Sequence, residues 1–101
     1  MAFRKEQFET GVKTNIKKPS LYKVIMHNDD YTTMQFVVEL LTDIFRKRKE
    51  EAMQIMLNIH RKGYGVAGIY PREIAETKID LAHVKAKERG YPLKCTLEKE
   101  N

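Results

Sequence analysis

The side chains best suited to hold a ligand lie together in the segment 28–33, Asn-Asp-Asp-Tyr-Thr-Thr. Asn28, Asp29 and Asp30 all carry hydrogen-bond acceptors, and they follow an apolar run that predicts a strand. Met34 then opens an apolar helical stripe. A cluster of acceptors beside such a stripe suits a ligand with a cationic head and an apolar body. Asn, Asp and Thr are also ordinary residues of turns and helix caps, so a purely structural role is the alternative.

Histidine and cysteine offer few other routes to chemistry. His60 lies one turn beyond Met56 on a predicted helix, where it either closes the same site or makes an ordinary hydrogen bond at the helix end. His27, His83 and Cys95 show none of the spacings typical of metal ligands, so we expect no metal and no other cofactor. A hydrolase would need Cys95 as nucleophile with a histidine base, but Cys95 alternates with leucines in a predicted strand. That pattern favours a buried, inert thiol.

The run Gly63-Tyr64-Gly65-Val66-Ala67-Gly68 matches the G-x-G-x-x-G pattern of dinucleotide-binding proteins. That pattern must follow a strand and open a helix, whereas here a helix precedes it and the run itself predicts a strand. The run is also too apolar for the exposed G-x-x-G loop that clamps RNA phosphates. We therefore expect these glycines to allow close packing within a strand.

The composition limits the classes of protein. The chain has 101 residues, 42% of them apolar, which is enough for one core, and a formal net charge of +5. Five bases and two acids in residues 1–18 account for +3 of this charge, so the rest of the chain is nearly balanced. The basic run 46–49 and the pair 61–62 therefore predict a solvated surface and no nucleic-acid partner. A small RNA-binding or ribosome-associated module is the alternative, and a steep salt dependence of binding would reveal it.

The sequence carries no sign of export or of membrane insertion. Its first residues lack the apolar core of a secretory signal, and no apolar run approaches the roughly 20 residues of a membrane span. A single cysteine, Cys95, cannot form an internal disulfide. We expect a cytoplasmic protein with no membrane partner.

The elements that must position these side chains follow the order β-α-α-β-α-β, which predicts an α+β fold with one small sheet and helices on one face. We expect a flexible N-terminal arm over residues 1–18 and one domain over residues 19–101. The predicted strands are 21–27, 64–70 and 93–98. The first predicted helix starts at Met34 after a Thr32–Gln35 capping box and runs into the basic residues 46–49. The second runs from Glu50 to near Gly63, and the third from Pro71 to Gly90.

Six groups of residues, in this order and spacing, point to one family. They are Pro19-Ser20-Leu21-Tyr22-Lys23-Val24, Asn28-Asp29-Asp30-Tyr31-Thr32 with Met34 and Phe36-Val37, Ala52-Met53 with Met56 and His60, Gly63 with Gly68, Glu73-Ile74-Ala75-Glu76-Thr77-Lys78, and Pro92-Leu93 with Cys95-Thr96-Leu97-Glu98. Over residues 19–101 the chain resembles the ClpS adaptor family. The resemblance implies a fold of three antiparallel strands and three helices, similar to the C-terminal domain of the ribosomal stalk protein.

The resemblance also implies a non-enzymatic adaptor. ClpS-like proteins bind N-degron peptides and proteins, whose first residue is free and bulky (Leu, Phe, Tyr or Trp), and deliver them to a AAA+ unfoldase, ClpA or ClpC, of the ClpP protease. The residues implied to surround the substrate amine are Asn28, Asp29 and His60, with Asp30 and Thr32 shaping the rim. The residues implied to line the apolar pocket are Met34, Val37, Met56, Ile59 and Leu93, with Met34 as a gate against β-branched side chains.

Docking to the unfoldase N-domain is implied to involve Glu73, Glu76 and Lys78, and residues 1–18 match the family's N-terminal extension, which engages the unfoldase during delivery. A monomer suits such an adaptor. One position departs from the family pattern, because Thr33 stands where the family often has proline. Thr33 keeps a good helix start but is expected to loosen the turn before the Met34 gate.

Overall fold

Three strands and three helices follow one another in the predicted order. The computed structural model describes residues 19–100. Its elements are β1 (Leu21–His27), α2 (Met34–Asp43), α3 (Lys49–Lys62), β2 (Tyr64–Pro71), α4 (Arg72–Glu88) and β3 (Lys94–Lys99). The α+β class and the order of elements are confirmed. The arm expected over residues 1–18 lies outside the described residues.

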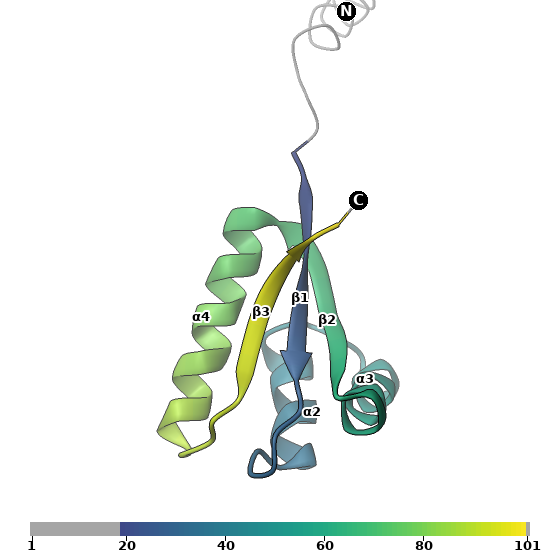
Figure 1. Ribbon diagram of the computed structural model, residues 1–101, viewed down its shortest axis with the longest axis vertical. Helices are drawn as coiled ribbons and strands as arrows, with labels where there is room; N and C mark the ends of the chain where they lie inside the picture. Colours follow the sequence, from purple (N-terminus) through teal and green to yellow (C-terminus); the bar gives the residue numbers. More distant parts are fainter. Residues whose placement is uncertain (1–18, 101) are drawn as a thin grey trace, which may run out of the picture.

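β1 is the central strand of an antiparallel sheet with the order β2-β1-β3. It is strongly apolar, and Val24 and Met26 have no exposed surface. Figure 1 shows β1 between the other two strands, with α2 behind the sheet, α3 next to the start of β2 and α4 beside β3. His27, the last residue of β1, pairs with Tyr64 on one side and Lys94 on the other. The loop that follows β1 therefore leaves the sheet from a point held by both neighbours.

One apolar core joins the sheet to all three helices. From α2, Phe36, Leu40 and Leu41 enter this core with at most 2% of their surface exposed. On α4 the buried face consists of Ala75, Ile79, Ala82 and Ala86, at spacings of three and four residues. The three small alanines allow α4 to pack closely against the sheet.

The start of α2 differs from the sequence-based expectation. Thr33 is the N-cap, and its hydroxyl accepts a hydrogen bond from the Phe36 N–H at 3.1 Å. Thr33 has the extended backbone of an N-cap, whereas the Thr32 hydroxyl donates to Asp29. The predicted Thr32–Gln35 capping box is therefore wrong.

The end of α2 is also earlier than predicted. Its last residue is Asp43, and its last turn contains no basic side chain. The Lys47 N–H donates to the Leu41 carbonyl at 2.9 Å, so the chain turns back directly after the helix. Arg46 occupies the left-handed region in this turn, with a φ of 58°. The basic residues 46–49 thus form the connection between two helices, and the last of them begins α3.

Glycines control the junction between α3 and β2. Gly63 ends α3 with a φ of 95°, which only glycine adopts without strain. At Gly65, an added Cβ would lie 2.8 Å from Cγ1 of Ile59, so the strand packs closely on α3 and a larger residue would force Ile59 to move. Close packing within a strand is confirmed, and the G-x-G-x-x-G run forms the end of α3 and part of β2.

The boundaries of α4 and β3 differ from the prediction by one or two residues. Pro71 is the N-cap of α4 and not its first helical residue. Arg89 is the C-cap, and Gly90 follows it with a φ of 78°. β3 begins one residue late, at Lys94, and continues to Lys99.

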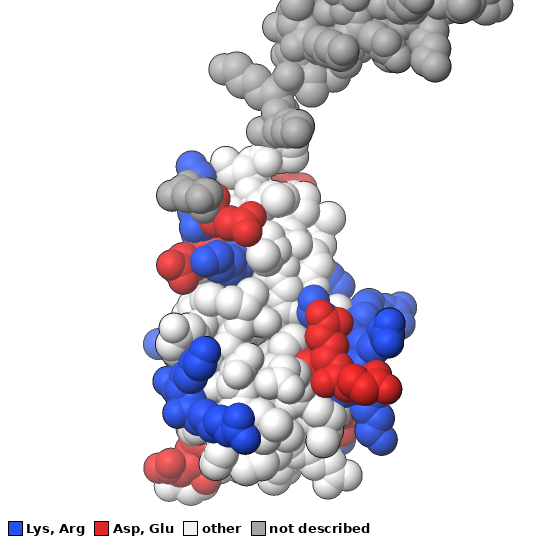
Figure 2. Space-filling view, turned by 90° about the vertical axis from the view of Figure 1, so that its right-hand side faces the viewer, with Lys and Arg blue, Asp and Glu red and all other residues white. Residues whose placement is uncertain are grey.

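The side of the molecule formed by β2 and α3 carries both signs of charge. Figure 2 shows an uncharged strip along this side, with basic and acidic side chains together on both margins. Within residues 19–100, none of the helices combines the length and apolar character of a membrane span. The same residues contain no group of three His, Cys, Asp or Glu side chains arranged to hold a metal ion.

Candidate functional site

The loop after β1 is organised around one carboxylate. Asp29 Oδ1 accepts hydrogen bonds from the backbone N–H groups of Tyr31 and Thr32, at 2.8 and 2.7 Å. Asp29 Oδ2 accepts a third from the Thr32 hydroxyl, at 2.7 Å. An ionised carboxylate can accept about four hydrogen bonds, so Asp29 can still accept one from a ligand.

These hydrogen bonds also favour the ionised form of the Asp29 carboxyl group. Partial burial disfavours the charged form and acts to raise the pKa, but the hydrogen bonds from Thr32 and Tyr31 together outweigh it. The pKa of Asp29 is therefore lowered from its ordinary value. The loop presents a fixed negative charge at neutral pH.

A backbone hydrogen bond joins this loop to the end of α3. The Asn28 N–H donates to the Gly63 carbonyl at 2.9 Å. Since Gly63 directly follows the last turn of α3, the bond brings His60 beside the loop. The result is a polar hollow of about 400 Å³ lined by Asn28, Asp29, Asp30, Tyr31, Thr32, Thr33, Met34 and His60. The structure thus brings Asn28, Asp29 and His60, the residues implied to surround an amine, into one hollow together with the rim residues Asp30 and Thr32.

The residues implied to form an apolar pocket divide into one exposed residue and a buried group. Met34, the first residue of α2, is 45% exposed. Val37, Met56, Ile59 and Leu93 belong to the core and are between 3% and 7% exposed. Met34 is therefore the member of this set that can move without disturbing the core.

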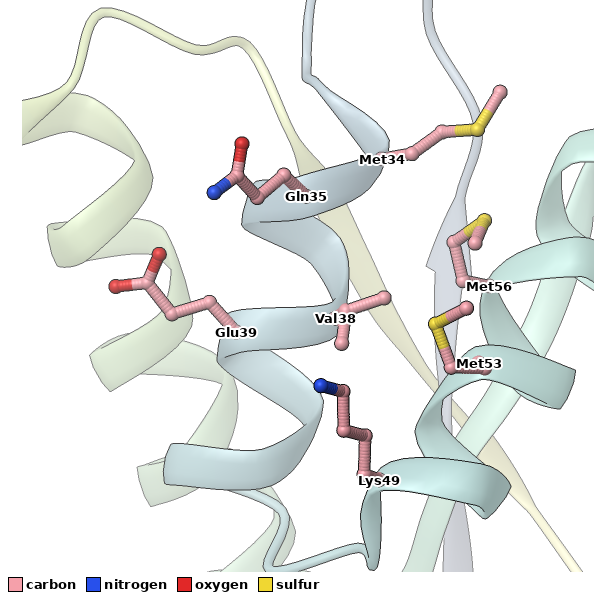
Figure 3. A pocket seen from close by; sticks show the side chains of 7 residues that line it. All are labelled: Met34, Gln35, Val38, Glu39, Lys49, Met53 and Met56. Atoms are coloured by element: carbon pink, nitrogen blue, oxygen red, sulfur yellow. The ribbon is translucent and has the colours of Figure 1, made fainter.

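A second hollow, of about 500 Å³, runs from Met34 between α2 and α3. Figure 3 shows the side chains of Val38, Met53 and Met56 in the space between the two helices, with Met34 at one end and Lys49 at the other. We call it the methionine groove, and its lining residues are Met34, Gln35, Val38, Glu39, Lys49, Met53 and Met56.

Sequence reasoning missed five of these groove residues, namely Gln35, Val38, Glu39, Lys49 and Met53. The spacing of four residues from Met34 to Val38, and of four and three from Lys49 through Met53 to Met56, puts each set on one helix face. That periodicity was the available signal. The sequence does not show that these two faces are neighbours, because their contact depends on how α2 and α3 pack.

The residues implied to dock an unfoldase lie near the start of α4 in different environments. Glu73 and Glu76 are exposed, and Glu76 forms an ion pair with Arg72 at 3.1 Å. Lys78 turns toward the fold, where its Nζ donates to the Ile44 carbonyl at 2.8 Å and lies 5.2 Å from the centre of a tyrosine ring. Lys78 thus satisfies a carbonyl at the end of α2.

Cys95 is unsuited to nucleophilic catalysis. Its side chain is buried, and this burial raises the pKa of the thiol to about 12. His83 is already engaged, because its Nε2 accepts a hydrogen bond from the Cys95 backbone N–H at 2.9 Å. The expectation of a buried thiol is confirmed.

Comparison with known proteins gives a consistent result. The family described as "ATP-dependent Clp protease adaptor protein ClpS" matches residues 17–96. A relative from Lawsonia intracellularis, named ATP-dependent Clp protease adapter protein ClpS, is 54% identical over 90 residues, which are 89% of this chain and 83% of the relative. A relative of the same name from Shewanella halifaxensis is 50% identical over 93 residues, 92% of this chain and 91% of the relative.

A solved structure, Agrobacterium tumefaciens ClpS2 bound to L-phenylalaninamide, is similar over 82% of this chain and 100% of its own. The TM-score is 0.78 and the sequence identity is 42%. Fold and comparisons together define an adaptor of the Clp protease, not an enzyme. The chain belongs to the ClpS family.

Proposed function

We propose that the chain binds proteins through a free, bulky, hydrophobic first residue and delivers them to a Clp unfoldase. The observation that carries this proposal is the polar hollow, in which Asn28, Asp29 and His60 converge beside Met34. A free α-amine has a pKa of about 8 and is mostly charged at neutral pH. Capture of an amino terminus by such acceptors is a recurrent mode of peptide recognition.

Each of the three acceptors contributes differently to binding the ammonium group. Asp29 supplies a negative charge, and hydrogen bonds between charged partners are the stronger class. Asn28 supplies an amide oxygen. Neutral His60 supplies a nitrogen lone pair that is lost when the ring is protonated. Asp30 and Thr32 shape the rim of the hollow.

The apolar side chain of the first residue provides the remaining affinity. We propose that it enters past Met34 and packs on Val37, Met56, Ile59 and Leu93. Fully burying a Leu or Phe side chain contributes roughly 1.5–3 kcal/mol, whereas micromolar affinity requires about 8 kcal/mol. Neither the amine nor the side chain is sufficient alone, so recognition requires both. The ligand bound to Agrobacterium ClpS2, L-phenylalaninamide, has a free amine and an aromatic side chain, and this supports the proposal.

Delivery is proposed to use the exposed start of α4, where Glu73 and Glu76 face solvent. The partner is the N-domain of a AAA+ unfoldase, ClpA or ClpC, and the adaptor acts as a cytoplasmic monomer. The family description, an adaptor of an ATP-dependent protease, supports this step.

The decisive experiment compares two labelled peptides that differ only at the amino terminus. One begins with free Phe and the other with acetyl-Phe, and fluorescence anisotropy measures their affinity for the full chain. Because acetylation removes the charge and adds bulk, we expect micromolar binding of the free peptide and at least about tenfold weaker binding of the acetylated one. Equal binding of both peptides, or binding of neither by folded protein, would refute the amine site.

A further inference from the structure

The methionine groove continues the proposed amine site. Met34 lines both the polar hollow and the groove, so a chain leaving the hollow past Met34 meets the groove directly. Its walls are apolar and adaptable, since Met53 is 43% exposed and Val38 is partly buried. Thioether side chains suit surfaces that must accept varied apolar partners.

The far end of the groove has a positive charge. Its two charged lining residues are Glu39 and Lys49. Both carboxylate oxygens of Glu39 accept from Arg89, at 3.2 and 3.1 Å. Lys49 forms no salt bridge with any other residue of the part described, 19–100. A ligand carboxylate at this end would find an ammonium group that is not already paired.

The length of the groove matches a short extended peptide. Lys49 and Met56 are seven residues apart on α3, and at about 1.5 Å of rise per residue this separation is roughly 10 Å. An extended chain advances about 3.4 Å per residue, so three steps cover the same roughly 10 Å. If the first substrate residue lies at Met34 and Met56, the fourth lies at Lys49.

We propose that the methionine groove is a second recognition site for the substrate, which selects an apolar residue at its third position and an acidic residue at its fourth. In an extended chain the first and third side chains lie on the same side, so the third residue packs on Val38 and Met53. The fourth side chain lies on the opposite side of the peptide backbone, at the rim of the groove, where the exposed and flexible Lys49 side chain pairs with its carboxylate. This inference rests on the proposed function and extends it from the first residue to the sequence behind it.

The test uses three ligands, each with a free amine, and the full chain. Phenylalaninamide probes the first residue alone. Two pentapeptide amides, Phe-Ala-Leu-Glu-Ser and Phe-Ala-Leu-Lys-Ser, differ only in the charge at position four. Calorimetry at low ionic strength gives the affinities for the natural chain and for Lys49→Glu, Met53→Glu and the control Lys85→Glu. The control makes the same charge change at an exposed site on α4.

We expect the natural chain to prefer the Glu peptide by about three- to fivefold, the size typical of exposed ion pairs. Lys49→Glu reverses this preference and Lys85→Glu leaves it unchanged. Met53→Glu weakens both peptides by about fivefold while phenylalaninamide binds all variants equally. Thermal unfolding of each variant establishes that it is folded.

Three results would overturn the inference. Equal affinity for both peptides, with phenylalaninamide still bound, refutes the second site and leaves the proposed function intact. Loss of phenylalaninamide binding in Met53→Glu means that the groove holds the first residue. Failure of the natural chain to bind phenylalaninamide refutes the proposed function and the second site with it.

Discussion

At the scale of single residues, the proposed site combines one fixed charge with one titratable acceptor. Because the pKa of Asp29 is lowered, the charged carboxylate stabilises the fold fully at any pH above the ordinary Asp pKa of about 3.9. This stabilisation is lost only as the pH falls through the lowered pKa of Asp29. Asp29 therefore stays charged throughout mildly acidic conditions. Histidine, by contrast, changes charge between about pH 8 and pH 5.

This difference predicts how binding depends on pH. Between about pH 7 and about pH 5.5 the substrate amine and Asp29 are both already charged, whereas histidine is the residue type whose charge ordinarily changes in this range. We expect the affinity for free-Phe peptide to fall several-fold over this interval, because protonated His60 cannot accept a hydrogen bond. The matched control is His60→Asn, which keeps an acceptor that does not titrate and should bind with a flat pH profile. If the affinity of the natural chain does not change with pH over this interval, His60 is not an acceptor for the substrate amine.

Met34 carries the second prediction at this scale. Its side chain is 45% exposed while the apolar residues around it are buried, so truncation opens space without removing core packing. We expect Met34→Ala to raise the affinity for peptides that begin with Val or Ile by about tenfold and to leave the melting temperature nearly unchanged. Competition binding with Leu and Val peptides measures this. An unchanged preference for Leu over Val would show that Met34 is not the gate.

Sequence reasoning at this scale identified the residues of the hollow but not their bonding. Thr32 and Thr33 are both good N-caps, and only the backbone angles decide that Thr33 caps α2 while Thr32 bonds to Asp29. A sequence pattern cannot separate two adjacent threonines. Asn28, Asp29 and Asp30 were easier to find because they are consecutive in the chain.

At the scale of elements, the α2 N-cap gives a paired prediction. Thr33→Ala removes the acceptor for the Phe36 N–H and should lower the free energy of unfolding by about 1 kcal/mol. Thr33→Pro also removes this bond, but the φ of −75° at this position suits proline, which contributes about 0.4–1 kcal/mol by restricting the unfolded chain. We therefore expect denaturant unfolding to show a clear loss for Ala and almost none for Pro. Equal losses for Thr33→Ala and Thr33→Pro would mean that the fit of proline to this backbone angle does not stabilise the protein.

Element boundaries were predictable where one residue type has a unique conformational role. Gly63 ends α3 because of its positive φ, and the alternation after Pro92 placed β3 within two residues. The end of α2 was not predictable, because residues 44–48 contain no glycine or proline to mark the turn. A positive φ at Arg46 is an exception that composition does not signal.

At the scale of the whole molecule, Lys78 connects two elements that are distant in sequence. Its bond to the Ile44 carbonyl joins α4 to the end of α2 across 34 positions. No local pattern predicts such a contact. The same holds for the methionine groove, which exists only because α2 and α3 pack side by side.

The bond made by Lys78 gives α4 a role in stability that can be tested separately from its proposed role in docking. Lys78→Met keeps the aliphatic stem but loses the bond, so we expect about 1 kcal/mol less stability together with weaker unfoldase binding. Glu73→Ala, at an exposed site, should weaken binding of the ClpA or ClpC N-domain without changing stability. Thermal unfolding and calorimetric titration with the N-domain measure both properties. If Glu73→Ala binds normally, the docking surface lies elsewhere.

The hydrogen bonds around Asp29 have a kinetic consequence. Because the loop is already held in shape by three internal bonds, a substrate orders little of the protein when it binds. Association should then approach the usual rates for docking onto a formed surface, about 10⁵–10⁷ M⁻¹s⁻¹. At micromolar affinity such rates imply residence times of seconds or less. Such rapid exchange would suit the proposed delivery, in which the bound substrate passes to a second protein.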